Sequence, residues 1–312
     1  MIDFRELIKA GSHFGHQTSR WCPKMAPYIW GFKSKVHLID VSKTAFQLEK
    51  AALFLKGIAA QNKQILWVGT KNPAQNIIEE TAKKFDMPYV SHRWIGGTLS
   101  NYEQVKKSVT RLLHYEDVLA KAESHTFYTK KELNVFQKMV YRLERSVGGI
   151  RTLRWPIGAL VIVDVGKEGS ALLEASAMGV PVVAIVDTNC DPTLVDYVIP
   201  ANDDGKPSIK IICDYLSSFV EAGKQDAAKN SAATAEKARM AAAEKKAAIA
   251  EKMTDKVADK AVVEKQKKND TVAVDKVADK VATTDTVVDI KVDTKVEKKA
   301  EHAIIDDVSN QQ

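Results

Sequence analysis

The chain has 312 residues, enough for one large or two moderate domains, and carries 46 Lys and Arg against 40 Asp and Glu, a net charge of +6. Its three cysteines lie far apart with no CxxC pair, which argues against a disulfide framework and a structural zinc site. No apolar run approaches the length of a transmembrane helix and no secretory h-region is present, so we expect a cytoplasmic protein.

Composition changes after Lys224. All 15 glycines, all 9 prolines and every aromatic residue precede Gln225, and the remainder is mainly Ala, Val, Lys, Asp, Glu and Thr. Such a segment cannot bury enough apolar surface to offset the entropy of ordering. We therefore predict an α/β domain at 1–100 and 150–224, a helical hairpin inserted at 101–149, and a low-complexity tail at 225–312 that is flexible or partly helical.

Charge is divided unevenly within the first 224 residues. Residues 1–154 hold 25 basic and 13 acidic side chains, whereas residues 155–224 hold 4 basic and 10 acidic ones. A basic part and an acidic part in one domain indicate two faces with different partners. We expect a polyanion on the first, and a basic protein surface or cations on the second.

The N-terminal segment is predicted to contain one short helix at 3–10, followed by an irregular span at 13–40 that ends in a strand at 36–40. Basic and aromatic residues alternate in this span, a pattern that can neutralise phosphate and stack on unpaired bases. We predict nucleic-acid contact for Arg20, Trp21 and Lys24, and packing under the loop for Trp30. His13 and His16 are expected to be structural rather than metal ligands, since their spacing lacks further partners.

A helix is predicted at 42–61, a buried strand at 64–68 and a helix from Pro73 to residue 84. Lys71 lies between that strand and the helix, where a phosphate could bind. The segment is not a Walker loop, and no GxGxxG occurs anywhere in the chain. The absence of GxGxxG argues against a dinucleotide-dependent enzyme.

The segment SHRWIGGTLSNYEQVKK, residues 91–107, combines cations, an aromatic residue, two glycines and small polar groups before a helix. An anion facing it would meet guanidinium, ammonium and backbone N–H groups together. The alternative is an ordinary tight turn leading into a basic helix. The RNA-binding residues predicted here are Arg93, Trp94, Gly96, Gly97, Thr98, Asn101, Lys106, Lys107 and Arg111.

From residue 101 the apolar spacing becomes helical, breaks at 124–129 and resumes to residue 147, which predicts an antiparallel helical hairpin. Its outer faces carry more basic than acidic residues, which favours a polyanion partner over a merely solvated surface. Beyond it, strands at 159–164, 182–187 and 197–200 alternate with a helix at 167–178 and a final helix at 209–221 capped by Ser208. This alternation predicts βαβ units and a mostly parallel sheet.

Carboxylates follow the strands of this second half, where α/β proteins place ligands. A metal-dependent enzyme would need such a cluster, but no nucleophile–base pair or phosphate loop accompanies it. We expect no catalysis and no cofactor, and leave open passive binding of a divalent cation by Asp187, Asp203 and Asp204. A protein-interaction module with the acidic third as its working surface is the other alternative.

Five blocks in chain order resemble the bacterial small-subunit ribosomal protein S-two family: HFGHQTSRWCPKMAPYIWG, VGTKNPAQ, HRWIGGTLSN, MGVPVVAIVDTNCDP and VDYVIPANDD. The resemblance covers about residues 1–224, whereas the tail is longer than the family's usual pattern. It implies a flavodoxin-like parallel sheet with helices on both faces and a protruding helical hairpin. It also implies a structural role in the small ribosomal subunit, contact with the subunit's rRNA and neighbouring proteins, and help in docking the S-one ribosomal protein.

Overall fold

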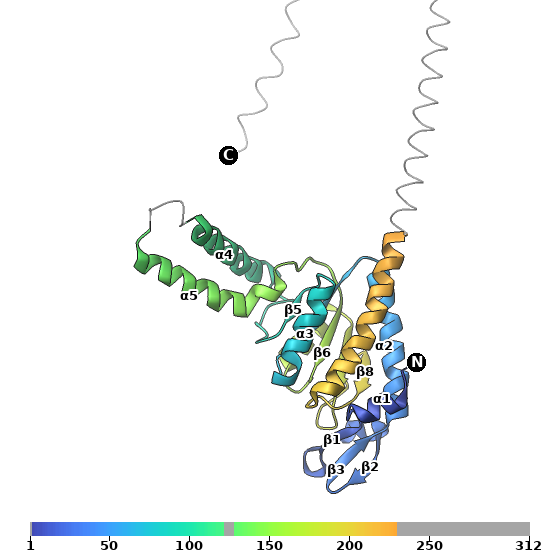
Figure 1. Cartoon of the computed structure of the whole chain (residues 1–312). Coiled ribbons are helices and arrows are strands. Elements are labelled where there is room, and N and C mark those ends of the chain that lie inside the picture. The colour runs from blue at the N-terminus through green and yellow to red at the C-terminus, as the bar shows by residue number, and fades with distance from the viewer. Residues whose placement is uncertain (1, 122–127, 230–312) are drawn as a thin grey trace, which may run out of the picture. The chain divides into compact units, whose positions relative to one another are not determined.

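The computed structural model describes residues 2–121 and 128–229, and its central element is a five-stranded parallel sheet (Figure 1). The strands run in the order β5-β4-β6-β7-β8, the flavodoxin-like order, which confirms the predicted α/β class. The predicted tail lies outside the described residues from 230 onward. The strand bounds are β4 Gln64–Val68, β5 Tyr89–Val90, β6 Ile157–Val163, β7 Val182–Val186 and β8 Tyr197–Pro200.

Helices cover both faces of this sheet, so its strands are apolar on both sides. On β6, Leu160 and Ile162 point to one apolar cluster while Val161 and Val163 point to the other, because side chains alternate along a strand. One face packs against α2 (Val41–Ala60), α3 (Asn72–Lys84) and a helix at 206–229; the other packs against α6 (Gly169–Met178) and the base of the hairpin.

Local sequence signals set the limits of several helices. The Asp40 carboxylate accepts a hydrogen bond from the Ser42 amide at 3.0 Å and so caps α2. Gly179 ends α6 with a left-handed φ of 67°, which suits glycine. No helix in the described part of the chain is long and apolar enough to cross a membrane.

The predicted hairpin is formed by α4 (Tyr102–Lys121) and α5 (Lys130–Val147), which extend together away from the sheet (Figure 1). The rings of Tyr115 and Phe136 stack between them with centroids 5.6 Å apart. At the base, two nitrogens of Arg151 donate to the carboxylate of Glu116 at 3.0 and 2.6 Å. This pair fixes α4 against the short 3-10 helix Gly148–Ile150 that leads back to the sheet.

The segment predicted to be irregular is instead a three-stranded antiparallel sheet, which follows α1 (Phe4–Lys9). Its strands are β1 Phe14–Gln17, β2 Ile29–Lys33 and β3 Val36–Ile39, in the order β1-β3-β2, with 3-10 helices Thr18–Arg20 and Pro23–Tyr28 before β2. The prediction failed because Ser34 and Lys35 make the β2–β3 turn with positive φ angles, without the usual Asn-Gly signature.

Two further predictions are wrong. Trp30 was expected to pack under a loop, but it lies on β2 with 76% of its surface exposed. Ser208 does not cap the last helix, because the helix begins at residue 206 and the buried Ser208 hydroxyl donates to the Asn202 carbonyl at 2.9 Å. That helix also continues to residue 229, past the predicted boundary after Lys224.

Candidate functional site

The Gly-Gly segment before α4 surrounds an anion that belongs to the protein itself. The Glu174 carboxylate on α6 accepts hydrogen bonds from the Gly97 amide at 2.8 Å, the Leu99 amide at 3.0 Å and the Ser100 amide at 3.3 Å. The Trp94 indole N–H adds a fourth bond at 3.0 Å. Gly97 has a φ of 91°, which orients its amide and favours glycine.

These bonds also set the charge state of the carboxylate. Burial alone would raise the pKa of Glu174, but the bonds from Trp94 and the backbone amides lower the pKa below its ordinary value, since they stabilise the ionised form. The backbone donors that were expected to meet an external phosphate are therefore occupied.

Trp94 and Thr98 are buried, in contrast to their expected place at an interface. The Trp94 ring packs in the core with 8% of its surface exposed, so it presents no open face to a base. The Thr98 hydroxyl donates to the Ile95 carbonyl at 2.6 Å. With Gly97, these residues form the turn that orients the start of α4, and their direct contact with RNA stays a prediction.

The cations that flank this turn are exposed. Arg93, Lys106, Lys107 and Arg111 lie on the surface, and no hydrogen bond or ion pair of their side chains is found within residues 2–121 and 128–229. Gly96 and Asn101 are also exposed. Arg93 and the first turns of α4 therefore present positive charge from a backbone that Glu174 holds in place.

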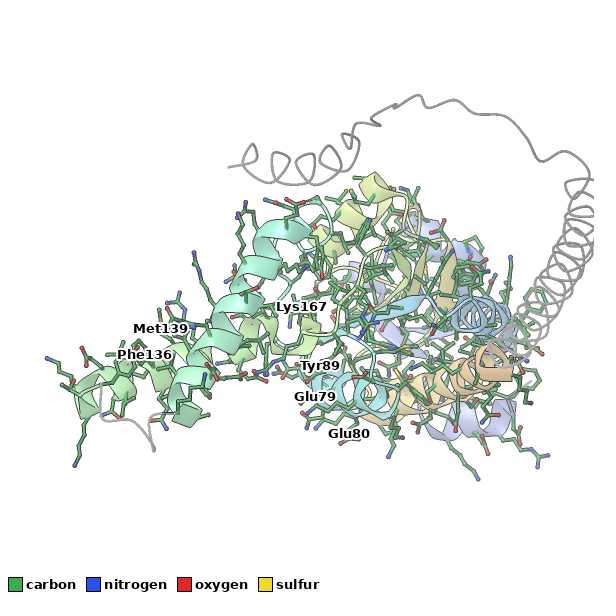
Figure 2. The ribbon with its side chains drawn as sticks, turned by 90° about the horizontal axis from the view of Figure 1, so that it is seen from above. Glu79, Glu80, Tyr89, Phe136, Met139 and Lys167 are labelled. Atoms are coloured by element: carbon green, nitrogen blue, oxygen red, sulfur yellow. The ribbon has the colours of Figure 1, made fainter. Side chains whose placement is uncertain are left out.

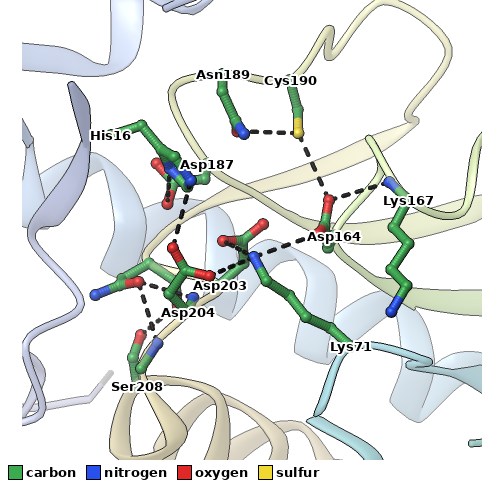
Figure 3. A network of polar contacts seen from close by, with 12 residues as sticks. His16, Lys71, Asp164, Lys167, Asp187, Asn189, Cys190, Asp203, Asp204 and Ser208 are labelled. Carbon is green, nitrogen blue, oxygen red and sulfur yellow. Dashed lines mark hydrogen bonds and ion pairs between the residues drawn. The ribbon is translucent and has the colours of Figure 1, made fainter. Parts of the chain in front are cut away.

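Lys71 has a different environment, at the end of the sheet where the carboxyl ends of its parallel strands meet (Figure 3). We call this end the carboxyl edge. Its ammonium lies 2.6 Å from Asp204, 2.8 Å from Asp203 and 3.3 Å from Asp164. Burial alone would lower the pKa of Lys71, but the bonds to Asp203 and Asp204 raise the pKa above its ordinary value. The predicted phosphate ligand is thus paired internally, so direct contact with RNA does not fit its position.

The same edge holds His16, whose Nδ1 lies 2.9 Å from the buried Asp187 carboxylate and whose Nε2 lies 3.3 Å from Asp204. The hydrogen bond with Asp187 raises the pKa of the imidazole. This contact joins the small antiparallel sheet to the carboxyl edge, as does the Cys22 amide, which donates to the Thr188 carbonyl at 2.7 Å.

Asp203 is the most unusual member of the cluster, because its side chain is fully buried. One of its oxygens bonds to Lys71, and within the described part of the chain Oδ2 has no hydrogen-bond partner. Burial and the neighbouring Asp187 charge raise the pKa of this carboxyl to about 7. His16, Asp203 and Asp204 each place one donor atom within 4.8 Å of the others, so the residues present fit a small cation.

The crevice between the carboxyl ends of β4 and β6, where flavodoxin-like folds bind ligands, is closed by side chains. The Thr70 hydroxyl donates to the buried Glu168 carboxylate, and the Lys167 ammonium donates to the Thr70 carbonyl at 3.0 Å. Burial raises the pKa of Glu168. These contacts link the segment that follows β4 to the segment that follows β6.

Of the N-terminal residues predicted to bind RNA, Lys24 donates to Asp191 at 2.6 Å and to Thr193 at 2.9 Å on the surface. Arg20 is exposed, and Trp21 is 39% exposed with its ring 5.3 Å from that of His37. Sequence reasoning missed Glu174, which lies far from the glycines it bonds. Phe32, which belongs to the alternating basic and aromatic pattern but was not singled out, is 72% exposed beside Trp30 on β2.

Comparison with known proteins agrees with this architecture. The family described as Ribosomal protein S2 matches residues 7–223. The chain belongs to the ribosomal protein S2 family. The small ribosomal subunit protein uS2 of Corynebacterium jeikeium is 42% identical over 238 residues, which cover 76% of this chain and 86% of the relative.

Two other relatives give the same result. The uS2 proteins of Psychrobacter cryohalolentis and Hahella chejuensis are each 41% identical over 76% of this chain, covering 89% and 97% of the relatives. The resemblance seen in the sequence is therefore confirmed, and the chain is a ribosomal protein of the small subunit. The S2 family is one of structural ribosomal proteins rather than enzymes.

Proposed function

We propose that this S2-family protein binds small-subunit rRNA through Arg93 and the basic surface of the hairpin, chiefly Lys106, Lys107 and Arg111. The supporting observation is that these cations are exposed and unpaired among the described residues, at a point where Glu174 fixes the backbone. Such groups suit phosphate and sugar, which position a protein on folded RNA without selecting a sequence. Arg20, Trp21 and Asn101 are secondary contacts in this proposal, whereas Lys24 is already paired.

The test replaces Lys106, Lys107 and Arg111 by Gln in the full chain and measures affinity for rRNA over a range of salt. Removing three cations that neutralise phosphates should weaken binding and lower the slope of log K against log salt by roughly 2 to 3. The matched control replaces three remote exposed lysines, Lys9, Lys50 and Lys210. Equal slopes for the two triple variants would remove the hairpin from the interface.

For the S-one ribosomal protein, we propose docking on the outer edge of the small antiparallel sheet. Trp30 and Phe32 are the two most exposed large apolar residues in the described chain, and large exposed apolar groups mark interaction surfaces. They lie two residues apart on β2, which is an edge strand whose outer side carries unpaired backbone groups. An extended segment of a partner could pair with this edge while its side chains pack on the two rings.

A pull-down of purified S-one protein by the full-length chain tests this docking surface. We expect Trp30→Ser with Phe32→Ser to abolish retention while binding of rRNA persists. The matched control is Leu53→Ser with Leu173→Ser, two exposed apolar residues on α2 and α6. Retention of the S-one protein by the β2 variant would place its docking site elsewhere.

We further propose that His16, Asp203 and Asp204 bind a divalent cation, with Asp187 orienting the imidazole. The supporting observation is the buried Oδ2 of Asp203, which has no hydrogen-bond partner among the described residues. The imidazole of His16, which bonds to Asp187, belongs to the same cluster. Metal-binding histidines commonly donate their other ring N–H to a carboxylate. Imidazole with carboxylates suits Zn²⁺ or Mn²⁺ better than Mg²⁺.

Calorimetric titration of the full chain with Zn²⁺, Mn²⁺ and Mg²⁺ tests the cation site. Asp204→Asn should weaken binding of the preferred ion by roughly tenfold or more, as is usual when a ligand or its orienting partner is removed. Asp191→Asn is the control, because Asp191 pairs with Lys24 outside the cluster. Equal affinities for the two variants would exclude the site.

A further inference from the structure

A second basic region lies at the opposite edge of the sheet, where β4 and β6 begin. A cavity of about 610 Å³ opens there between the end of α2, the end of α3, the segment before β6 and the helix at 206–229. Its volume falls within the usual range of small-molecule and cofactor pockets. The residues that matter for its chemistry are Lys63, Asp86, Arg154, Trp155 and Lys224.

The charge of this cavity is one-sided. Lys63 and Arg154 are exposed, and within residues 2–121 and 128–229 no ion pair of either side chain is found. The Lys224 ammonium donates to the Phe85 carbonyl; burial lowers its pKa, whereas the nearby Asp86 charge acts in the opposite direction. Asp86 is the one carboxylate in the lining. A bound anion would offset the excess of positive charge in the cavity.

An aromatic platform accompanies the cations. Trp155 lines the cavity with 43% of its surface exposed. The backbone beside it is fixed, because Gln64 donates to the Thr152 carbonyl at 2.8 Å and accepts from the Arg154 amide at 2.6 Å. An exposed indole next to a fixed backbone and two exposed cations is a combination that can bind an unpaired nucleotide, the base by stacking and the phosphate by charge.

We infer that this cavity, the amino-edge pocket, binds an unpaired nucleotide of RNA through Trp155, Lys63, Arg154 and Lys224. The inference rests on the proposed binding of rRNA and adds a contact that the hairpin does not provide. RNA is favoured over an acidic peptide because a base can stack on the indole of Trp155. The carboxylates of a peptide would interact with the cations but would gain nothing from the aromatic ring. The pocket selects a single-stranded nucleotide, since a base within a duplex is stacked between its neighbours and offers no free face to Trp155.

The test measures binding of the full chain to a short unstructured oligouridylate, to an RNA duplex of equal length and to oligoglutamate. Lys63→Gln with Arg154→Gln should lower the salt slope for the oligouridylate by roughly 1.4, about 0.7 for each phosphate that is no longer neutralised. Trp155→Leu keeps apolar bulk and should weaken oligouridylate binding roughly tenfold, while binding of the duplex and of oligoglutamate changes little.

Controls separate this pocket from the hairpin and from misfolding. Lys9→Gln with Lys50→Gln removes two exposed cations elsewhere and should leave the slope unchanged. The hairpin triple variant should keep the part of oligouridylate binding that depends on Trp155. The hairpin proposal and this inference can therefore fail independently, because they are tested by different variants. Thermal unfolding verifies that each variant is folded. An unchanged slope in the Lys63 and Arg154 variant, or equal loss of all three probes in Trp155→Leu, would overturn the inference.

Discussion

Lys71 at the carboxyl edge of the sheet and Lys106 on α4 carry the same charge in opposite surroundings. Lys71 is enclosed by three aspartates within 3.3 Å (Figure 3). Lys106 is exposed on the hairpin, which projects from the sheet domain in Figure 2. A charge that is neutralised inside the protein stabilises the fold, while an exposed cation is available to a polyanion. The difference shows that a lysine at a typical ligand position need not bind a ligand.

The Gly-Gly segment extends the comparison to backbone donors. Its amides resemble a phosphate-binding loop, yet they bind the Glu174 carboxylate. The internal anion occupies these amides, whereas the side chain of Arg93 and the basic residues of the first turns of α4 face outward. In this domain, conventional anion sites hold the protein's own carboxylates, and the exposed cations lie on the hairpin and at the amino edge.

The largest effect is expected for Lys71→Met. Removing the ammonium leaves the buried Asp203 and Asp164 carboxylates without their cation, so the free energy of unfolding should fall by about 3 kcal/mol or more. Urea unfolding measures this change. Adding Asp203→Asn should restore part of the loss, because one uncompensated carboxylate is removed.

Lys24→Met is the control for this comparison, since the Lys24–Asp191 pair is exposed and should contribute little that can be measured. Equal urea midpoints for the Lys71 and Lys24 variants would show that the carboxyl-edge ion pairs do not stabilise the fold.

A smaller effect is expected for Glu174→Gln, which keeps the shape of the side chain but removes its charge. The new NH₂ group would face backbone N–H donors, and the charge-assisted hydrogen bonds would be lost. The free energy of unfolding should therefore fall by about 2 kcal/mol. Hydrogen exchange of the Gly97 and Leu99 amides should also accelerate. Glu80→Gln, an exposed change on α3, is the control. Unchanged exchange would mean that Glu174 does not hold the loop.

The same carboxylate predicts a pH dependence. The folded-state pKa of Glu174 lies below its unfolded value, so its contribution is complete above the unfolded pKa and is lost as pH falls through the folded pKa. We expect the wild type to lose more stability than Glu174→Gln on acidification from neutral pH to about pH 3. Melting temperatures of both proteins over this range provide the test. Parallel curves would contradict the assignment.

The alternation of apolar runs and helical periodicity was enough to predict the parallel sheet and the hairpin, because both patterns are local. It also predicted that aspartates after successive strands would meet at one edge. Two findings could not be predicted in this way. The β2–β3 turn lacks Asn-Gly, and the anion of the Gly-Gly segment comes from Glu174, whose contact depends on the packing of α6.

The placement of single residues was less predictable than the elements. Trp94 adjoins Arg93 in sequence, yet Trp94 is buried while Arg93 is exposed, since the turn separates their directions. Trp30 shows the opposite error, since it was predicted to be packed and is exposed. The sequence alone does not distinguish an aromatic residue on an exposed edge strand from one that packs in the interior. Sequence patterns identified which segments carry basic and aromatic residues, but not which side chains remain accessible.

The smallest effect on stability is expected for Lys106→Gln, Lys107→Gln and Arg111→Gln together. These side chains have no hydrogen bond or ion pair in the described residues, and exposed substitutions of this kind usually change stability by about 0.5 kcal/mol or less. Urea unfolding of the triple variant should therefore match the wild type, although its binding of rRNA is weakened. A large loss of stability would show that these cations are structural, like Lys71, and would explain any loss of RNA binding without direct contact.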